Sequence, residues 1–187
     1  QEPSPATQPG SDRQTISGTA GDDVFNATAA EETFDGRAGN DTVSYADSTA
    51  AITVDIVAGG TTGDASGDTY ANIENLTGSA HADSLGGDAA ANILSGGAGD
   101  DMLVGRGGAD TLLGGAGTDT ASYAGSGTGV TVSLSTGLGS GGDADGDTLD
   151  GIENLIGSDH ADTLTGNTGA NLLQGGAGDD TLVGGGA

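Results

Sequence analysis

A nine-residue repeat in the middle of the chain constrains its fold more than any other feature. Three units follow one another without a gap, at residues 96–104, 105–113 and 114–122. Each has the form G-(G/R)-x-G-x-D-x-U-x, in which U is apolar. The first six residues favour a turn, because glycine tolerates positive φ and close backbone approach. The last three place one apolar side chain between two outward ones, which is the period of a short β-strand.

Two such units make one coil of turn, strand, turn and strand, so turns on the same edge are 18 residues apart. This spacing places Asp83, Asp101 and Asp119 in one row, and Asn92 and Asp110 in the other. Stacked carboxylates repel one another, and a hard cation between the turns removes the repulsion. Ca²⁺ takes about six to eight oxygens from carboxylates and carbonyls. A nonapeptide of this form is a signature of a calcium-binding parallel β-helix.

The pattern resembles the RTX family, the haemolysin-type calcium-binding repeat proteins, over most of the chain. The resemblance implies several Ca²⁺ ions, each held between two stacked turns by an aspartate from each turn and by turn carbonyls. The candidate aspartates at position six are Asp23, Asp41, Asp83, Asp101, Asp110, Asp119, Asp162 and Asp180. The candidate turn glycines are Gly18, Gly21, Gly36, Gly39, Gly96, Gly99, Gly105, Gly108, Gly114, Gly117, Gly175 and Gly178. Position six departs from aspartate at Glu32, Asn92 and Asn171, where we expect weaker or empty sites.

The repeats are interrupted twice by segments that resemble each other. Repeat blocks cover residues 18–44, 78–122 and 157–187, and the insertions cover residues 45–77 and 123–156. Tyr45 in the first insertion corresponds to Tyr123 in the second, and an I-E-N-L segment follows in both. A module that repeats with its insertion intact indicates that the insertion is a widened turn of the coil and not a separate domain.

These observations predict an all-β fold: a right-handed parallel β-roll, or calcium-stacked β-solenoid, with two widened-turn insertions over residues 17–187. Residues 1–16 are rich in Pro, Gln, Ser and Thr, which predicts a flexible linker or tail. Helices are not expected, because 39 glycines destabilise them. The U residues expected to line the interior are Phe25, Phe34, Val43, Leu85, Leu94, Leu103, Leu112, Leu164, Leu173 and Leu182.

The charge and composition of the chain exclude some classes of binding partner. There are 28 acidic and 3 basic residues, for a net charge of −25. Nucleic acid is not an expected partner, because binding to phosphates depends on Lys and Arg. Membrane insertion is not expected either, because no apolar run approaches about 18 residues. No cysteine is present, so a bound metal is the expected substitute for disulfides.

Two further motifs have alternative readings. The acidic loops 64–68 and 143–147 have closely spaced carboxylates, and either bind an extra calcium ion or are solvated, although neither is an EF-hand. His81 and His160 occupy position four of equivalent units and are read as polar turn residues, with a metal ligand or general base as the alternative. No catalytic constellation stands out, so the chain is not expected to be an enzyme, and any catalytic domain would lie outside it.

The functional prediction is a calcium-binding module of a secreted, extracellular bacterial protein. The resemblance implies export by a type I system in an unfolded state, followed by folding on external Ca²⁺. The alternative is an adhesive or polysaccharide-binding module with a glycan or cell-surface partner. In either case an upstream domain of the same chain is expected.

Overall fold

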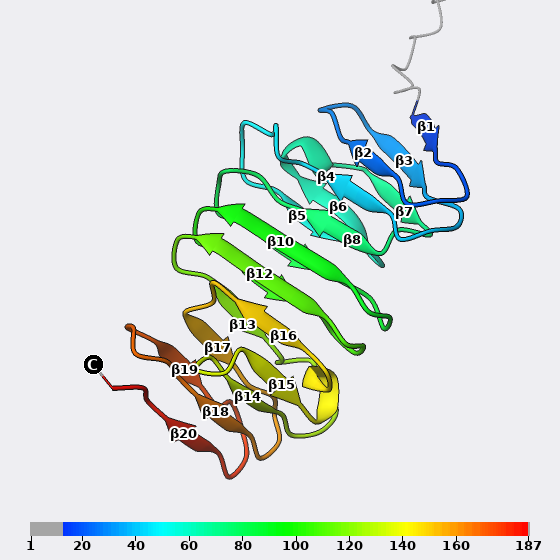
Figure 1. Ribbon diagram of the computed structural model, residues 1–187. Helices are drawn as coiled ribbons and strands as arrows, with labels where there is room; N and C mark the ends of the chain where they lie inside the picture. Colours follow the sequence, from blue (N-terminus) through cyan, green and yellow to red (C-terminus); the bar gives the residue numbers. More distant parts are fainter. Residues whose placement is uncertain (1–12, 187) are drawn as a thin grey trace, which may run out of the picture.

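The computed structural model describes residues 13–186, and short parallel strands make up most of this part (Figure 1). The strands stack in two layers, with the N-terminal strands at one end and the C-terminal strands at the other. The expected all-β parallel β-roll is confirmed. Helical structure in the described residues is limited to two 3-10 turns, η1 Gly63–Ala65 and η2 Gly142–Ala144.

One layer is a ten-stranded sheet with the order β2-β4-β8-β10-β12-β16-β15-β14-β18-β20. Every pair in it is parallel except those that involve β15. Its strands are β2 Val24–Asn26, β4 Thr42–Ser44, β8 Asn75–Thr77, β10 Ile93–Ala98, β12 Thr111–Ala116, β14 Thr131–Ser133, β15 Leu138–Ser140, β16 Thr148–Asp150, β18 Thr163–Thr165 and β20 Thr181–Val183.

The opposite layer contains a seven-stranded sheet, β19-β17-β13-β11-β9-β5-β6, and a three-stranded sheet, β1-β3-β7. Strand β6 contacts β7, so the smaller sheet continues the larger one on the same side. The strands are β1 Gln14–Ser17, β3 Glu32–Asp35, β5 Thr53–Asp55, β6 Gly59–Thr62, β7 Thr69–Ala71, β9 Ser84–Gly86, β11 Met102–Val104, β13 Thr120–Ser122, β17 Asn154–Ile156 and β19 Leu172–Gln174.

Adjacent coils in the repeat blocks pair in register at a spacing of 18 residues. Ile93 of β10 pairs with Thr111 of β12, and Leu85 of β9 pairs with Leu103 of β11. Because side chains alternate along a strand, this register directs every U residue toward the interior. The stacking of U residues in rows along the roll therefore follows from the nine-residue length of the repeat.

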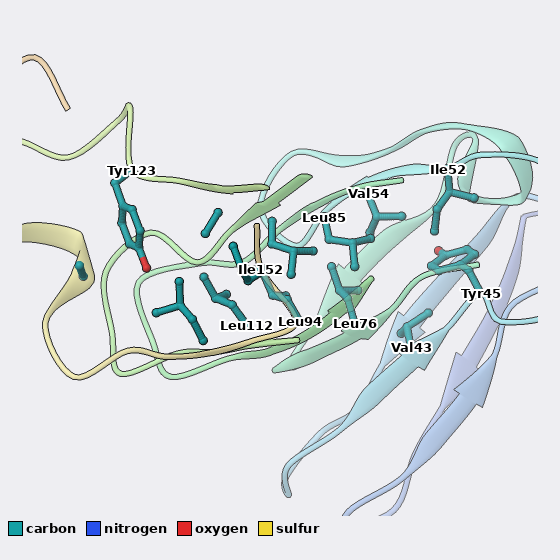
Figure 2. Packing of buried hydrophobic residues seen from close by; sticks show 14 of the residues in the cluster. Val43, Tyr45, Ile52, Val54, Leu76, Leu85, Leu94, Leu112, Tyr123 and Ile152 are labelled. Carbon is teal, nitrogen blue, oxygen red and sulfur yellow. The ribbon is translucent and has the colours of Figure 1, made fainter. Parts of the chain in front are cut away.

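The core is a single narrow row of apolar side chains between the layers (Figure 2). All of the expected U residues from Phe25 to Leu164 are buried. Leu173 is partly buried, and Leu182 is 48% exposed because its strand β20 is the last in its sheet. Figure 2 shows Tyr45 and Tyr123 at opposite ends of the leucines, and both rings are buried.

The insertions contain strands and are more than widened turns. In the first, β5 and β6 form an antiparallel hairpin, and β7 then returns to pair with β3. The next strand, β8, pairs directly with β4 on the opposite side. The insertion thus adds three strands to one layer while the other layer gains one. The second insertion repeats this arrangement with β14, β15 and β16.

The two three-strand additions lie on opposite sides of the roll. The first belongs to the layer of β9 and β11, and the second belongs to the ten-stranded sheet. Five repeat units, an odd number of half-coils, separate them between residues 78 and 122. The second insertion therefore begins from the opposite layer.

The start of the roll overlaps the segment for which a linker was expected. Gln14–Ser17 form β1, which pairs in parallel with β3. The remainder of the expected linker, residues 1–12, lies outside the described residues.

Candidate metal centre

A ladder of hydrogen bonds runs along each edge of the roll and passes through the residues at position six. The backbone N–H of Asp83 donates to Oδ1 of Asp101 at 2.8 Å, and that of Asp101 donates to Oδ1 of Asp119 at 2.8 Å. The same bond joins Asp23 to Asp41 and Asp162 to Asp180. Each carboxylate thus stacks on the amide of the preceding coil. This arrangement reduces direct contact between neighbouring carboxylates.

The ladder continues through the insertions by means of other acidic side chains. Oε2 of Glu74 accepts the N–H of Asp41 at 2.8 Å, and Oε2 of Glu153 accepts that of Asp119 at 2.8 Å. Both glutamates belong to the I-E-N-L segments. These glutamates therefore take the place of a position-six aspartate one coil further on.

The residue at position two separates the turns into two kinds. In one kind, which we name closed turns, its backbone N–H donates to the side-chain oxygen at position six. In closed turn 78–83, for example, the N–H of Ser79 donates to Oδ2 of Asp83 at 2.5 Å, and the Ser79 hydroxyl donates to Oδ1. The position-two residues of closed turns are Thr19, Thr28, Ser79, Asp88, Ser158 and Asn167.

The remaining turns, which we name open turns, have a position-two residue with positive φ. These residues are Arg37, Gly97, Arg106, Gly115 and Gly176, with φ between 70° and 106°. In open turns the outer oxygen of the aspartate receives no such bond. Oδ2 is buried and has no hydrogen-bond partner in Asp41, Asp101, Asp110 and Asp119. Buried oxygens of this kind are costly unless another group satisfies them.

Oxygens from successive coils converge beside the glycine at position one. A Cβ atom added to Gly36 would lie 2.3 Å from Oδ2 of Asp41 and 2.1 Å from the carbonyl oxygen of Asn72. A Cβ on Gly114 would lie 2.6 Å from Oδ2 of Asp119 and 1.9 Å from the carbonyl oxygen of Gly151. Only glycine keeps these spaces open. A carboxylate and a carbonyl facing one space are the ligands that a hard divalent cation prefers.

Burial without a partner perturbs the acidity of these groups. Burial raises the pKa of Asp110 to about 7 and that of Asp101 to about 6, and neighbouring carboxylates add to the effect. The pKa of Asp119 is raised for the same reasons. Hydrogen bonds from the ladder amides act in the opposite direction and do not offset the burial. The charged forms of Asp101, Asp110 and Asp119 are therefore disfavoured in the fold until a positive charge is supplied.

Asn92 and Asn171 have a neutral amide at position six, where the other turns have a carboxylate. Nδ2 of Asn92 donates to the carbonyl oxygen of Glu74 at 2.8 Å, and Nδ2 of Asn171 donates to that of Glu153 at 2.9 Å. Their turns are closed, because Oδ1 of each accepts the N–H at position two. These two side chains are hydrogen-bonded within the protein through both their oxygen and their nitrogen.

In each insertion, a tyrosine hydroxyl satisfies the outer oxygen of an aspartate. The hydroxyl of Tyr45 donates to Oδ2 of Asp68 at 2.6 Å, and that of Tyr123 donates to Oδ2 of Asp147 at 2.9 Å. Oδ1 of Asp68 accepts the ladder amide of Glu32. Oδ1 of Asp147 accepts that of Asp110. Each acidic loop therefore directs its last aspartate into a ladder, and both oxygens of that aspartate are bonded within the protein.

The remaining candidates lie apart from these spaces. His81 and His160 are exposed, and each donates its backbone N–H to the serine at position two. Within residues 13–186, no group of three or more His, Cys, Asp or Glu side chains comes together in a way that could hold a metal ion. A cation at the open turns would therefore rely on backbone carbonyls together with at most two carboxylates.

Sequence reasoning grouped all eight aspartates and missed three features. The first is the residue at position two, which distinguishes open from closed turns. It is Gly or Arg in open turns and Ser, Thr, Asp or Asn in closed turns. The I-E-N-L glutamates and the tyrosine–aspartate pairs were also missed as ladder members. Their recurrence in both insertions was the available signal.

We predict that the metal-free chain gains structure on acidification. The pKa values of Asp101 and Asp110 in the fold lie above their ordinary value near 3.8. The stability from their protonation is fully present below that value and is lost as pH rises through about 6 to 7. Far-ultraviolet circular dichroism with a chelator of divalent metals should show more β-structure at pH 5 than at pH 8. Equal spectra, or loss of structure at pH 5, would contradict this.

Comparison with known proteins agrees with this geometry. A family model described as the RTX calcium-binding nonapeptide repeat matches residues 9–43, 86–121 and 156–187, which is more than half of the chain. No curated protein matches the chain. In the described part, no helix has the length and apolar character needed to cross a membrane. The repeat is a structural calcium-binding element and not a catalytic one, and RTX proteins are typically secreted. The chain belongs to the RTX family, and its repeats bind several Ca²⁺ ions.

Proposed function

We propose that this chain is a module that folds when it binds extracellular Ca²⁺ and that is exported by a type I system as part of a larger bacterial protein. The observation that carries the proposal is the set of buried, unpartnered Oδ2 atoms in Asp41, Asp101, Asp110 and Asp119. A net charge of −25 adds general repulsion to this local cost. Without a cation, the compact state is therefore disfavoured.

Calcium supplies the missing charge at the open turns. An ion there binds the free Oδ2 and the facing carbonyl, and the position-one glycine leaves room for it. Because the paired turns do not exist in the unfolded chain, the binding free energy becomes folding free energy. Extracellular calcium modules bind at about 10⁻⁴ to 10⁻³ M. The chain would then be unfolded at low calcium inside the cell and folded outside it.

We further propose that the ions occupy the open turns in preference to the closed turns. Asp41, Asp101, Asp110, Asp119 and Asp180 belong to open turns. In closed turns, a backbone N–H already occupies the outer oxygen of Asp23, Asp83 and Asp162. The carbonyl that faces the Oδ2 of an open turn comes from the following coil, as Asn72 does for Asp41 and Gly151 does for Asp119. Residues 17–187 form the module in this proposal, and catalysis, if the parent protein has any, belongs to a domain outside it.

Calcium dependence of folding tests the proposal directly. We expect a disordered circular dichroism spectrum in chelator and a β-rich spectrum at about 1 mM Ca²⁺. Mg²⁺ at the same concentration is the control and should be much less effective, because it demands a smaller octahedral site and gives up water reluctantly. A β-rich spectrum in chelator at pH 8 would overturn the proposal.

The placement of the ions is tested by Asp101→Asn. The variant should fold, because Asn92 and Asn171 show that an amide is accommodated at position six. It should bind at least one calcium ion fewer than the wild-type chain in equilibrium dialysis. Asp179→Asn removes the same charge at exposed position five and should leave the number of ions unchanged. Equal ion counts in the two variants would rule out Asp101 as a ligand.

A threonine row favours a second candidate function, the binding of a polysaccharide. On the ten-stranded sheet, Thr111 pairs with Thr148, and Thr131 pairs with Thr163, which pairs with Thr181. Of the residues that interrupt the threonines at position seven, Ser84 and Met102 lie in the opposite layer, in β9 and β11, whereas Ile93 lies in β10 and pairs with Thr111. The second insertion adds Thr148 and Thr131 to this sheet, with β15 between them, whose Leu138 pairs with Thr148 and whose Ser140 pairs with Thr131.

Glycan-array binding at saturating calcium tests this second function. The double substitution Thr148→Val and Thr163→Val should weaken binding at least about tenfold if the row contacts a sugar. Thr120→Val in β13, in the opposite layer, is the matched control and should bind like the wild-type chain. Absence of binding by the calcium-loaded wild-type chain would remove this candidate and leave the first intact.

A further inference from the structure

Within residues 13–186, the roll has an open strand edge in both layers at each end (Figure 1). Strands β1 and β2 begin the two layers, and β19 and β20 end them, so each of the four pairs with a neighbour on one side only. None of the four contains a charged residue or a proline, which commonly prevent an edge strand from pairing with another molecule. These edges can therefore be extended by further strands.

The coils at the two ends also leave apolar side chains uncovered. Leu182 is 48% exposed, whereas Leu164, the U residue one coil before it, is buried. Val183, next to Leu182 in β20, is exposed as well. At the other end, Val24 of β2 is exposed and Ile16 of β1 is only partly buried. A further coil packed on either end would remove apolar surface from water, which favours association.

The ladder of hydrogen bonds has an unused donor at one end of the roll and an unused acceptor at the other. The N–H of Asp162 donates to Oδ1 of Asp180, but the N–H of Asp180 has no acceptor among the described residues. In the first coil, Oδ2 of Asp23 accepts the N–H of Thr19, and its Oδ1 accepts no bond from the part of the chain that the structure describes. The two ends are therefore complementary in the ladder bond itself.

The order of the strands at the two ends permits one copy to stack on another. The described strands finish with β19 in one layer and β20 in the ten-stranded sheet, and they begin with β1 and β2 in the same two layers and the same order. Strands β1 and β2 of a second copy could therefore pair in parallel with β19 and β20. The register used inside the roll would place Ile16 beside Leu173 and Phe25 beside Leu182. The apolar row would then continue from one copy into the next.

Turn 175–180 is an open turn that no described coil follows. Gly176 has φ of 94°, and a Cβ on Gly175 would lie 2.2 Å from Oδ2 of Asp180. Where a repeat unit does follow, its position-one carbonyl faces such a space: a Cβ on Gly157 would lie 2.7 Å from the carbonyl oxygen of Gly175. In a stacked second copy, Gly18 holds the corresponding position. The second copy thus supplies the carbonyl that this open turn lacks.

We propose that copies of this chain associate head to tail in calcium, and that the Asp180 turn of one copy and the Gly18 turn of the next form a shared calcium site. The inference rests on the proposed function, because it assigns the ion to an open turn. The second copy is the partner because its first coil offers the strand order, the ladder acceptor and the glycine carbonyl that the last coil lacks. Since the two contacting surfaces differ, the association produces a series of oligomers and not only a dimer.

Sedimentation velocity of the 187-residue chain at about 1 mM Ca²⁺ tests the inference. We expect oligomers that grow as the protein concentration rises. Asp180→Asn keeps Oδ1 for the bond from Asp162 and removes the charge from the shared site, so it should weaken association by about tenfold or more. Asp179→Asn removes the same charge from an exposed neighbour and should associate like the wild-type chain. Equal association of the two variants would refute the shared site.

Two edge variants test the polarity of the contact. The N–H at position seven donates to the coil before it, as Thr181 does to Asp162, so the N–H of Val24 faces the open side of β2. Successive N–H groups alternate in direction, so that of Leu182 faces the open side of β20. Proline is tolerated where the missing N–H faces an open edge. Val24→Pro and Leu182→Pro should each be monomeric alone, and their mixture should give a one-to-one dimer and nothing larger.

Circular dichroism of the same samples verifies that each variant folds and reports on the proposed function separately. Folding that does not depend on calcium would refute the function. A wild-type chain that folds with calcium and stays monomeric would leave the function intact and overturn the inference, and the open end would then suit further coils of the same polypeptide. Oligomers formed by either proline variant alone, or a wild-type dimer that does not grow with concentration, would also overturn it.

Discussion

The hydrogen bond from a backbone amide to the carboxylate one coil further on is the interaction on which the rest of the structure depends. It uses one oxygen of each aspartate and leaves the other to be satisfied separately. A narrow roll has only one row of apolar side chains and cannot offset many buried charges by burial of apolar surface alone. The different ways of satisfying that second oxygen therefore decide where the roll needs metal and where it is complete without it.

Four solutions occur along the chain. A backbone N–H closes turns such as 78–83, an amide serves at Asn92 and Asn171, and a tyrosine hydroxyl serves at Asp68 and Asp147. The fourth, in our proposal, is a cation, at the turns whose position-two residue has positive φ. The metal-independent solutions concentrate at the insertions and at the boundaries of the repeat blocks. On the proposal made above, calcium is needed most in the regular central part, where open turns 96–101 and 114–119 follow each other on one ladder.

Much of the fold could be predicted from the period of the repeat. The 18-residue register, the inward direction of Leu103 and Leu112 and the single row that joins Asp83, Asp101 and Asp119 all follow from two strands per coil. The insertions were harder. The alternation of Ile52, Val54 and Ile56 with polar residues is a strand signal for β5. Strand β6 consists of Gly and Thr without apolar alternation, so nothing in its sequence indicates the reversal. The roles of Tyr45 and Glu74 depend on contacts between distant residues, which periodicity does not describe.

The position of the two insertions on opposite layers has a consequence for the shape of the molecule. Each adds two surplus strands, roughly 10 Å of height, to one side only, and so acts as a wedge. With an odd number of units between them the wedges oppose each other, and each layer finishes with the same total of ten strands. Loss or gain of a single nonapeptide would put both wedges on one flank and curve the rod, whereas loss or gain of a pair would preserve its straightness. The parity of the repeat number, and not only its size, is thus a structural variable in this protein.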